Sequence, residues 1–330
     1  MMGQRMTAWQ SWGTKLQPVQ SDDRRPSPDP TDLPDGHPDP LAPPPTPRRR
    51  RPAVTVAGTV TVTIILAAAA WVGAAVPASS AYTTLRYGDH DRQVVTVYPA
   101  AAPRPPLAVY IHGGAWRMGS PARVRAKPQW FGEAGWAFAS VGYRVLPDAQ
   151  VEEQAQDVAA GLRALRADAG RLGFDPDRIL IMGHSAGAHL AALVATDGRY
   201  LGADRAAVRG VILLDGAGYD VSNEFKLRGP LARKLYGDAF GEDPVRQRTL
   251  SPIAHVDATD PPDWLIVFAE SRIDAREQTA QFGDALQRAG LRVERVPDPG
   301  NHMEINREFG TPGYRANTAI RALMARVAGG

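Results

Sequence analysis

The sequence predicts an α/β fold, in which a mostly parallel central sheet carries helices on both faces. From about residue 82 onward, short apolar runs typical of buried strands alternate with the periodic apolar stripes of helices. The apolar content of 44% in a chain of 330 residues is also ample for a hydrophobic core. We therefore expect one globular domain over residues 82–330.

Each element of this domain has its own signal. Seven apolar runs have the length and composition of strands. These runs are Gln93–Tyr98, Leu107–Ile111, Trp136–Val141, Ile179–Met182, Val211–Leu214, Trp264–Phe268 and Val293–Val296. Two sets of apolar residues at helical spacing predict helix faces between them, namely Val151, Ala155, Val158, Leu162 and Leu165, and Phe282, Leu286 and Ala289 before the helix-stop Gly290.

The composition of the chain excludes several kinds of site and partner. The chain has no cysteine, which excludes disulfides, thiolate nucleophiles and cysteine-based zinc sites. Its formal net charge is only +3, and this small value argues against a nucleic-acid partner. Covalent chemistry is left to Ser, Thr, Lys or carboxylate side chains, and we expect no metal and no cofactor.

Residues 1–52 differ from the rest of the chain. They hold twelve of the 29 prolines and no Ile or Phe. Such a segment cannot bury enough apolar surface to offset the entropy lost on ordering. We predict a disordered tail that lies in the cytoplasm.

A stretch without charged residues follows at 53–77, directly after the basic run Arg48-Arg49-Arg50-Arg51. Its length suffices to cross a bilayer, and positive charge on one flank marks the cytoplasmic side. We expect a transmembrane signal-anchor helix that places residues 82–330 outside the cytoplasm. Two alternatives remain open: a half-buried strand, because Val and Thr alternate in this stretch, and a signal cleaved near Ala81 that would give a secreted protein.

The strongest chemical signal is the sequence Gly183-His184-Ser185-Ala186-Gly187, which joins an apolar strand to a helix rich in small residues. This is the nucleophile-elbow pattern G-x-S-x-G in the context it requires. A side chain at either glycine would collide with the neighbouring helix or strand. We predict Ser185 to be a nucleophile at a helix N-terminus, where developing negative charge is favoured.

A second motif, His112-Gly113-Gly114-Ala115-Trp116, follows the strand at Leu107–Ile111. Glycines at a strand end allow backbone N–H groups to face an oxyanion. We predict an oxyanion hole made by the N–H groups of Gly114, Ala115 and Ala186. Trp116 and His184 are expected to line the substrate pocket.

A serine nucleophile needs a base, and the base needs a carboxylate to orient it. In proteins that carry the nucleophile-elbow pattern, the three residues follow one another along the chain in the order serine, acid, histidine. His302 lies late in the chain, after the strand that ends at Val296. The acid should follow the strand Trp264–Phe268, and we predict Asp274.

Taken together, these motifs resemble the α/β-hydrolases of the hormone-sensitive-lipase-like and kynurenine-formamidase-like esterases. The resemblance covers about residues 82–330 and includes Gly142-Tyr143-Arg144-Val145-Leu146-Pro147 and Asn301-His302. It implies an α/β-hydrolase fold, a triad of Ser185, Asp274 and His302, and the oxyanion hole given above. Ala115 replaces the third glycine of the lipase-type motif, and Phe268-Ala269-Glu270 replaces the His-Gly pair common before the acid.

The expected activity is hydrolysis of carboxylic esters with small or medium acyl groups, through an acyl-enzyme and without a metal or cofactor. A formamidase or other arylamide hydrolase is the alternative, because amides pass through the same tetrahedral intermediate. An exported binding module without turnover is the alternative from another class. The segment 216–252 is expected to cap the site, and the oligomeric state is not predicted.

Overall fold

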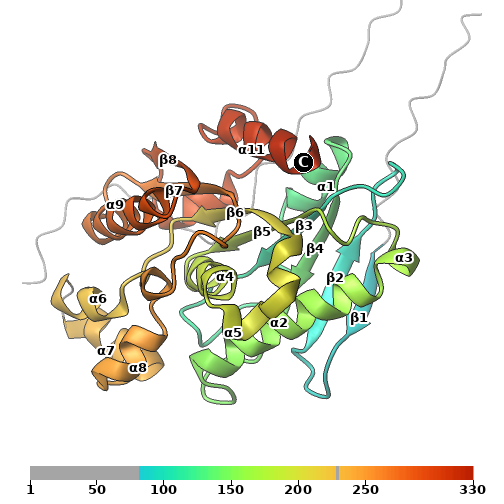
Figure 1. Cartoon of the computed structure of the whole chain (residues 1–330). Coiled ribbons are helices and arrows are strands. Elements are labelled where there is room, and N and C mark those ends of the chain that lie inside the picture. Colours follow the sequence, from blue (N-terminus) through green and yellow to red (C-terminus); the bar gives the residue numbers. More distant parts are fainter. Residues whose placement is uncertain (1–81, 228–229, 330) are drawn as a thin grey trace, which may run out of the picture. The chain divides into compact units, whose positions relative to one another are not determined.

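The structure is a computed structural model that describes residues 82–227 and 230–329 (Figure 1). The tail predicted at residues 1–52 and the helix predicted at residues 53–77 lie outside these ranges, so both stay predictions. Within the described ranges, no helix is both long and apolar enough to cross a membrane.

A single eight-stranded sheet forms the centre of the domain, in the order β1-β2-β4-β3-β5-β6-β7-β8. β1 and β4 both pair with β2 in antiparallel orientation, and all other neighbours are parallel. The strands are β1 Thr83–Arg86, β2 Val94–Tyr98, β3 Leu107–Ile111, β4 Ala137–Val141, β5 Ile179–His184, β6 Val208–Leu214, β7 Asp263–Ala269 and β8 Arg292–Asp298. The prediction of a mostly parallel sheet is confirmed.

All seven predicted strands are present, and the sequence missed one. The missed strand is β1, which has four residues, Thr83–Arg86. Three of the four are exposed, so no apolar run marks it. Edge strands of this kind carry the weakest sequence signal, because only one side of their backbone pairs and little of their side-chain surface is buried.

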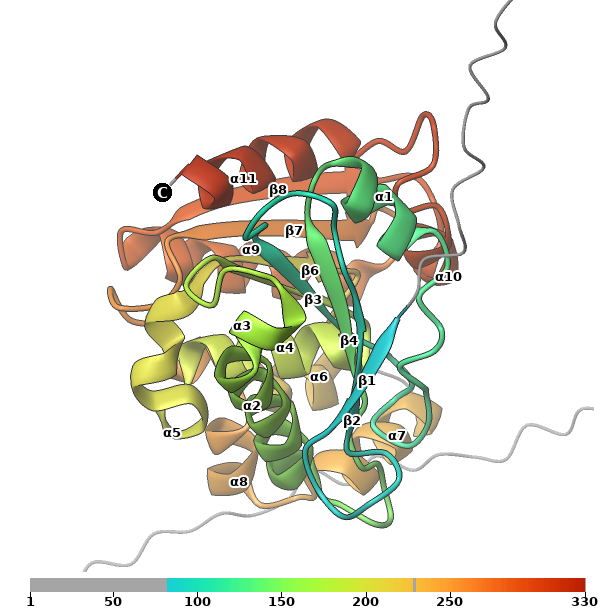
Figure 2. The same ribbon diagram turned by 90° about the vertical axis from the view of Figure 1, so that its right-hand side faces the viewer.

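Helices cover both faces of the sheet, as Figures 1 and 2 show. The longer helices are α1 Lys127–Glu133, α2 Val151–Ala167, α4 Ala186–Thr196, α9 Ile273–Arg288 and α11 Asn317–Gly329. Shorter ones are α3 Ala169–Leu172, α5 Gly198–Leu201 and α10 His302–Arg307, with 3₁₀ turns η1 Gly202–Ala207 and η2 Pro252–Ala254. The helix stripes predicted around Leu162 and Phe282 correspond to α2 and α9.

Two hydrophobic clusters, one on each face, hold the helices to the sheet. In β7, Trp264 and Ile266 pack into the cluster of α2, α4 and α9, whereas Leu265 and Val267 pack into that of α1 and α11. This alternation follows from the two-residue period of a strand. Because both faces are covered, β3 and β5 are buried along their whole length and β6 is buried except at Arg209, which is why these strands read as apolar runs.

Three further helices follow β6 and lie within the segment that was expected to cap the site. They are α6 Val221–Leu227, α7 Pro230–Phe240 and α8 Pro244–Thr249. Side chains of α7 reach the cavity that holds Ser185, because Leu235 and Tyr236 belong to its lining. The segment expected to cap the site thus borders it through α7.

Candidate active site

Ser185 stands at a sharp turn between β5 and α4. Its backbone has φ 57° and ψ −125°, an unusual conformation for a residue with a side chain. A Cβ at Gly183 would collide with the backbone of Gly187, and a Cβ at Gly187 would collide with the carbonyl oxygens of Ile111 and His112. The elbow predicted from the sequence is confirmed, including the reason for both glycines.

His302 is the first residue of α10, and its ring reaches Ser185. The Asn301 side chain caps this helix by accepting hydrogen bonds from the N–H groups of Met303 and Glu304. The cap fixes the backbone from which the imidazole projects. His302 Nε2 lies 3.0 Å from Ser185 Oγ, within hydrogen-bond distance, so the structure brings these two predicted residues together.

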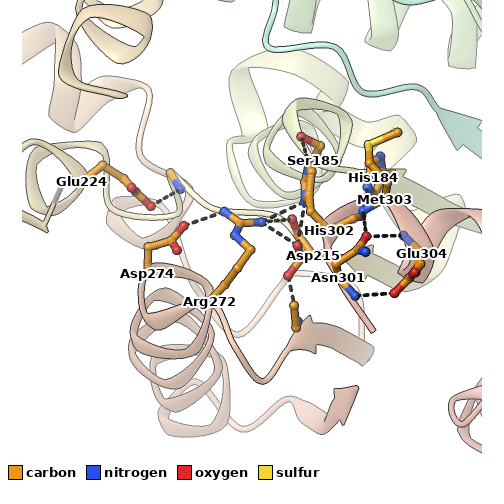
Figure 3. A network of polar contacts seen from close by, with 12 residues as sticks. His184, Ser185, Asp215, Glu224, Arg272, Asp274, Asn301, His302, Met303 and Glu304 are labelled. Carbon is orange, nitrogen blue, oxygen red and sulfur yellow. Dashed lines mark hydrogen bonds and ion pairs between the residues drawn. The ribbon is translucent and has the colours of Figure 1, made fainter. Parts of the chain in front are cut away.

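The carboxylate beside His302 is Asp215, and the prediction of Asp274 for this contact is wrong. Asp215 Oδ2 lies 2.6 Å from His302 Nδ1 (Figure 3). Asp274 instead lies in the first turn of α9 and accepts a hydrogen bond from Arg272 Nη2 at 2.5 Å. The Arg272 guanidinium occupies the space between the two carboxylates, so Asp274 does not reach the imidazole.

Asp215 is placed by the end of β6, the strand adjacent to β5 in the sheet. Its N–H donates to the carbonyl of Val267 at 2.7 Å, and its Oδ1 accepts from the N–H of Ala269 at 2.8 Å. Its φ of 45° lies in the left-handed region, which for a residue other than glycine is strained and often marks a functional site. The available sequence signal was a carboxylate directly after the apolar run Val211–Leu214.

The environment of Asp215 keeps it ionised. Burial alone would raise the pKa of this fully buried carboxyl. The hydrogen bond with His302, the positive charge of Arg272 and the bond from Ala269 outweigh burial and lower the pKa to about 2. Since an ionised carboxylate only accepts hydrogen bonds, the His302 Nδ1 atom must carry a hydrogen, and in the neutral imidazole Nε2 is then the acceptor that faces Ser185.

The loop after β3 lies against Ser185, since a Cβ at Gly113 would come within 2.9 Å of the Ser185 Cβ. Gly114 has φ +137°, and Ala115 and Trp116 have φ 53° and 59°, so the chain coils tightly here. Two hydrogen bonds fix the loop: the Tyr143 hydroxyl donates to the His112 carbonyl at 2.7 Å, and Gln154 Nε2 donates to the Trp116 carbonyl at 2.9 Å.

The three residues expected to form an oxyanion hole all line cavities that Ser185 also lines. Ala115 and Ala186 line a cavity with Ser185, and Gly114 lines a second cavity with it. Ala186 is the first residue of α4, so its N–H has no acceptor within the helix. All three residues therefore lie beside Ser185, and their role as an oxyanion hole stays a prediction.

Comparison with known proteins places the chain in a family. Residues 96–286, more than half of the chain, match the BD-FAE family. The chain belongs to the BD-FAE family. This match agrees with the resemblance to α/β-hydrolase esterases.

Individual relatives of this BD-FAE member carry esterase names. A probable isoprenylcysteine α-carbonyl methylesterase, ICMEL1 of Arabidopsis thaliana, is 28% identical over 63% of this chain and 48% of its own length. The esterase LipQ of Mycobacterium tuberculosis is 29% identical over 58% of this chain and 48% of its own length. The chain thus spans about half the length of these curated relatives.

A solved structure supports the fold assignment. Thermogutta terrifontis esterase 2, phosphonylated by sarin, superposes with a TM-score of 0.60 and 25% identity over 76% of this chain and 93% of its own. The predicted α/β-hydrolase fold is therefore confirmed.

His184 supports His302 from the other side in this BD-FAE domain. Its Nε2 donates to the carbonyl oxygen of His302 at 2.9 Å, and the two rings lie 4.7 Å apart between centroids. Burial is the largest of the causes that lower the pKa of His184 to about 3, so the ring is neutral near pH 7. His184 also lines a cavity beside Ser185, as the sequence predicted.

Ser185 lines two cavities. The first, of about 330 Å³, is lined mainly by apolar groups from the loop after β3 and from α7, among them Trp116, Leu235 and Tyr236. The second, of about 300 Å³, is bordered by Met118, Met303 and Asn306. Trp116 lines the first cavity, in agreement with the prediction. In the part of the chain that the structure describes, no cluster of His, Asp or Glu is arranged to hold a metal ion.

Proposed function

We propose that this BD-FAE member hydrolyses carboxylic esters of small or medium acyl groups, with Ser185 as nucleophile, His302 as general base and Asp215 as the acid that orients it. One observation carries the proposal. An unbroken line of contacts runs from Ser185 Oγ to His302 Nε2 at 3.0 Å and from His302 Nδ1 to Asp215 at 2.6 Å. The esterase names of the relatives and of the solved structure support the same reaction class.

The first half of the reaction forms an acyl-enzyme. Ser185 Oγ attacks the ester carbonyl carbon while its proton passes to His302 Nε2, and Asp215 stabilises the imidazolium that results. The negative charge on the former carbonyl oxygen is received by the N–H groups of Gly114, Ala115 and Ala186. One such donor is worth on the order of 10² to 10³ in turnover. When the tetrahedral intermediate collapses, Nε2 gives its proton to the leaving alcohol.

The second half reverses these roles with water. A water molecule loses a proton to His302 Nε2 and attacks the acyl carbon, and the carboxylic acid leaves as Ser185 recovers its proton. General-base assistance of this kind contributes about 10² to 10⁴ in rate. No step needs an electron acceptor or a Lewis acid.

The shape of the site supports small or medium acyl groups. The first cavity has a volume of about 330 Å³, and its lining includes Trp116 and Tyr236, both largely buried. Binding pockets for small molecules range from about 300 to 1,000 Å³, so this cavity lies at the low end. We assign the acyl group to this cavity and the alcohol to the second.

A substrate panel on the purified full-length chain tests the proposal. p-Nitrophenyl esters of rising acyl length are compared with N-formyl arylamines, and a fluorophosphonate probe is applied to the wild type and to Ser185→Ala. We expect ester turnover, with a maximum at short or medium acyl length, and labelling of Ser185 alone. Faster turnover of formyl arylamines would favour the amidase alternative. Labelling that survives Ser185→Ala would contradict the choice of nucleophile.

A further inference from the structure

Arg272 makes direct contact with the acid and the base of the proposed triad. It is the N-cap residue of α9, and its side chain turns back toward the end of β6 (Figure 3). Nη1 donates to Asp215 Oδ2 at 2.5 Å and to the Asp215 carbonyl at 3.2 Å, and it lies 2.9 Å from His302 Nδ1. Nη2 donates to Asp274 Oδ2 at 2.5 Å. Arg272 therefore bridges a carboxylate that touches the base and one that does not.

This arrangement has an electrostatic cost for the reaction. Asp215 Oδ2 is shared between the His302 ring and the Arg272 guanidinium, so its charge is partly taken up by the arginine. When His302 accepts the serine proton it becomes positive, and a cation within hydrogen-bond distance opposes that charge. A fixed arginine would thus weaken the stabilisation that Asp215 gives to the imidazolium, unless a second negative charge offsets it.

Asp274 is placed to supply that second charge. Its carboxylate lies on the side of the guanidinium that faces away from His302, and a planar guanidinium can bind one carboxylate at each terminal nitrogen. The Arg272 side chain is only 22% exposed and that of Asp274 16%, so solvent screens their charges only in part. Burial by itself lowers the pKa of Arg272, but the two carboxylates outweigh it and raise the pKa, so the guanidinium stays charged.

We propose that Arg272 and Asp274 are a positioning pair: Arg272 fixes Asp215 against the Nδ1 atom of His302, and Asp274 offsets the charge that Arg272 brings to the base. The inference rests on the proposed function, because it requires His302 to act as the base. Neither residue is assigned a contact with the reacting atoms. The acid is thus supported by a residue from the next strand connection, the place where the sequence had indicated the acid itself.

Other charged groups near the base are the same in every variant of the test. His184 faces the His302 ring from the end of β5 and stays neutral, because burial depresses its pKa to about 3. Burial is also the main cause that lowers the pKa of Lys127 to about 7, and its charge acts on His184. Since neither side chain is altered, differences between variants report on Arg272 and Asp274.

The test uses the full-length chain and the pH dependence of kcat/KM for one p-nitrophenyl ester, in Asp274→Asn, Arg272→Gln and the double variant. The acid limb of kcat/KM reports protonation of the base in the free enzyme. Removing a negative charge should move this limb to lower pH by about one unit, and removing the positive charge should move it to higher pH by about as much. The double variant should return to within about 0.3 unit of wild type, because it removes one positive and one negative charge from the same pair and so leaves the net charge beside the base unchanged.

Measuring kcat as well as the acid limb separates the effect of the Arg272 charge from the effect of its planar shape. Arg272→Lys keeps the positive charge but loses the planar fork that holds two carboxylates, so we expect the wild-type acid limb with kcat reduced about tenfold. Asp274→Asn should also lose about tenfold in kcat, because the imidazolium is then less well stabilised. Asp284→Asn is the matched control: Asp284 also lies on α9 and pairs with an arginine, Arg295, at 2.6 Å. This control should match wild type in both measurements.

Acid limbs that coincide in wild type, Asp274→Asn and Arg272→Gln, or that move in the same direction in both variants, would overturn the inference. If Arg272→Gln does not fold, Arg272→Lys and Asp274→Asn still test the inference. An acid limb that does not move in Asp274→Asn would contradict the proposal that Asp274 offsets the charge of Arg272. Ser185→Ala in the same assay separates this outcome from failure of the proposed function. If Ser185→Ala is inactive while the limbs do not move, only the positioning pair is wrong.

Discussion

His302 and Asp215 are 87 residues apart in the sequence, yet His302 Nδ1 and Asp215 Oδ2 are separated by only 2.6 Å. The two residues follow β8 and β6, which are separated in the sheet by β7 alone. In a parallel sheet the carboxyl ends of neighbouring strands meet at one edge, so residues after several strands can converge there. The connection after β7, between them, contributes Arg272 and not the acid.

The first prediction concerns this acid. Asp215→Asn should fold but lose on the order of 10³ to 10⁴ in kcat, because an amide in place of the carboxylate no longer sets the tautomer of His302. Turnover and a thermal melt of the same preparation measure the two effects separately. Glu270→Gln is the control, since Glu270 pairs on the surface with Arg315 at 3.5 Å, and it should stay within about tenfold of wild type. Full activity of Asp215→Asn would exclude it as the acid.

The proposed nucleophile and base could be chosen from the sequence because local residues mark both positions. Ser185 depends on two glycines within its own turn, and each is required by a collision that any side chain would cause. His302 follows a recognisable strand and is the only histidine in the last part of the chain. In both cases the signal lies within a few residues of the functional group.

The acid could not be chosen in the same way, because several strand ends meet near the base. Both Asp215 and Asp274 follow central strands at suitable distances, and the sequence does not show which of them reaches the imidazole. The deciding feature is Arg272, whose guanidinium lies between the two carboxylates and separates Asp274 from His302. The position of the Arg272 side chain depends on how the strand ends pack together, and no local sequence pattern predicts it. β1 was missed for a simpler reason, since an exposed edge strand has no apolar run.

The second prediction concerns acyl length. Ala217 is buried and lines the first cavity together with Trp116 and Tyr236. Ala217→Leu adds three carbon atoms to a space of about 330 Å³, so esters with longer acyl chains should lose activity while the acetate is nearly unaffected. The ratio of kcat/KM for hexanoate to that for acetate should fall about tenfold or more, as expected for discrimination by a few methylenes. An unchanged ratio would show that the acyl group binds in the second cavity.

The third prediction concerns the segment 53–77, which lies outside the described residues. Its lack of charge after the basic run at residues 48–51 favours a membrane anchor with the catalytic domain outside the cytoplasm. The full-length chain should sediment with membranes and resist a carbonate wash. A reporter that is active only outside the cytoplasm should work when fused after residue 330. Release of a shortened chain into the medium would favour cleavage near Ala81, and a fully cytoplasmic protein would exclude both readings.

The last prediction concerns stability in mild acid. Burial is the largest cause that lowers the pKa of each of three histidines, His112 and His189 to about 4 and His184 to about 3. The ordinary pKa of histidine is about 6.5, so in the unfolded chain these rings bind protons as the pH falls below that value, whereas in the folded chain they do not. Their contribution to stability is therefore complete above about pH 6.5 and is lost progressively as the pH falls toward 4.

One variant isolates this effect. His189 accepts a hydrogen bond from Trp116 Nε1 at 3.4 Å and donates from Nε2 to the carbonyl of Leu250 at 2.8 Å, and a glutamine amide can also accept and donate without titrating. Each neutral buried histidine changes the free energy of unfolding by up to about 1.4 kcal/mol per pH unit in this window. Urea unfolding at pH 7, 6 and 5 should therefore show a shallower loss of stability in His189→Gln than in wild type. Because the unfolded chain of the variant lacks one titrating ring, the stability of wild type minus that of His189→Gln should fall as the pH is lowered, whatever the difference at pH 7. Parallel curves would mean that His189 titrates in the folded protein as it does in the unfolded chain, which its complete burial argues against.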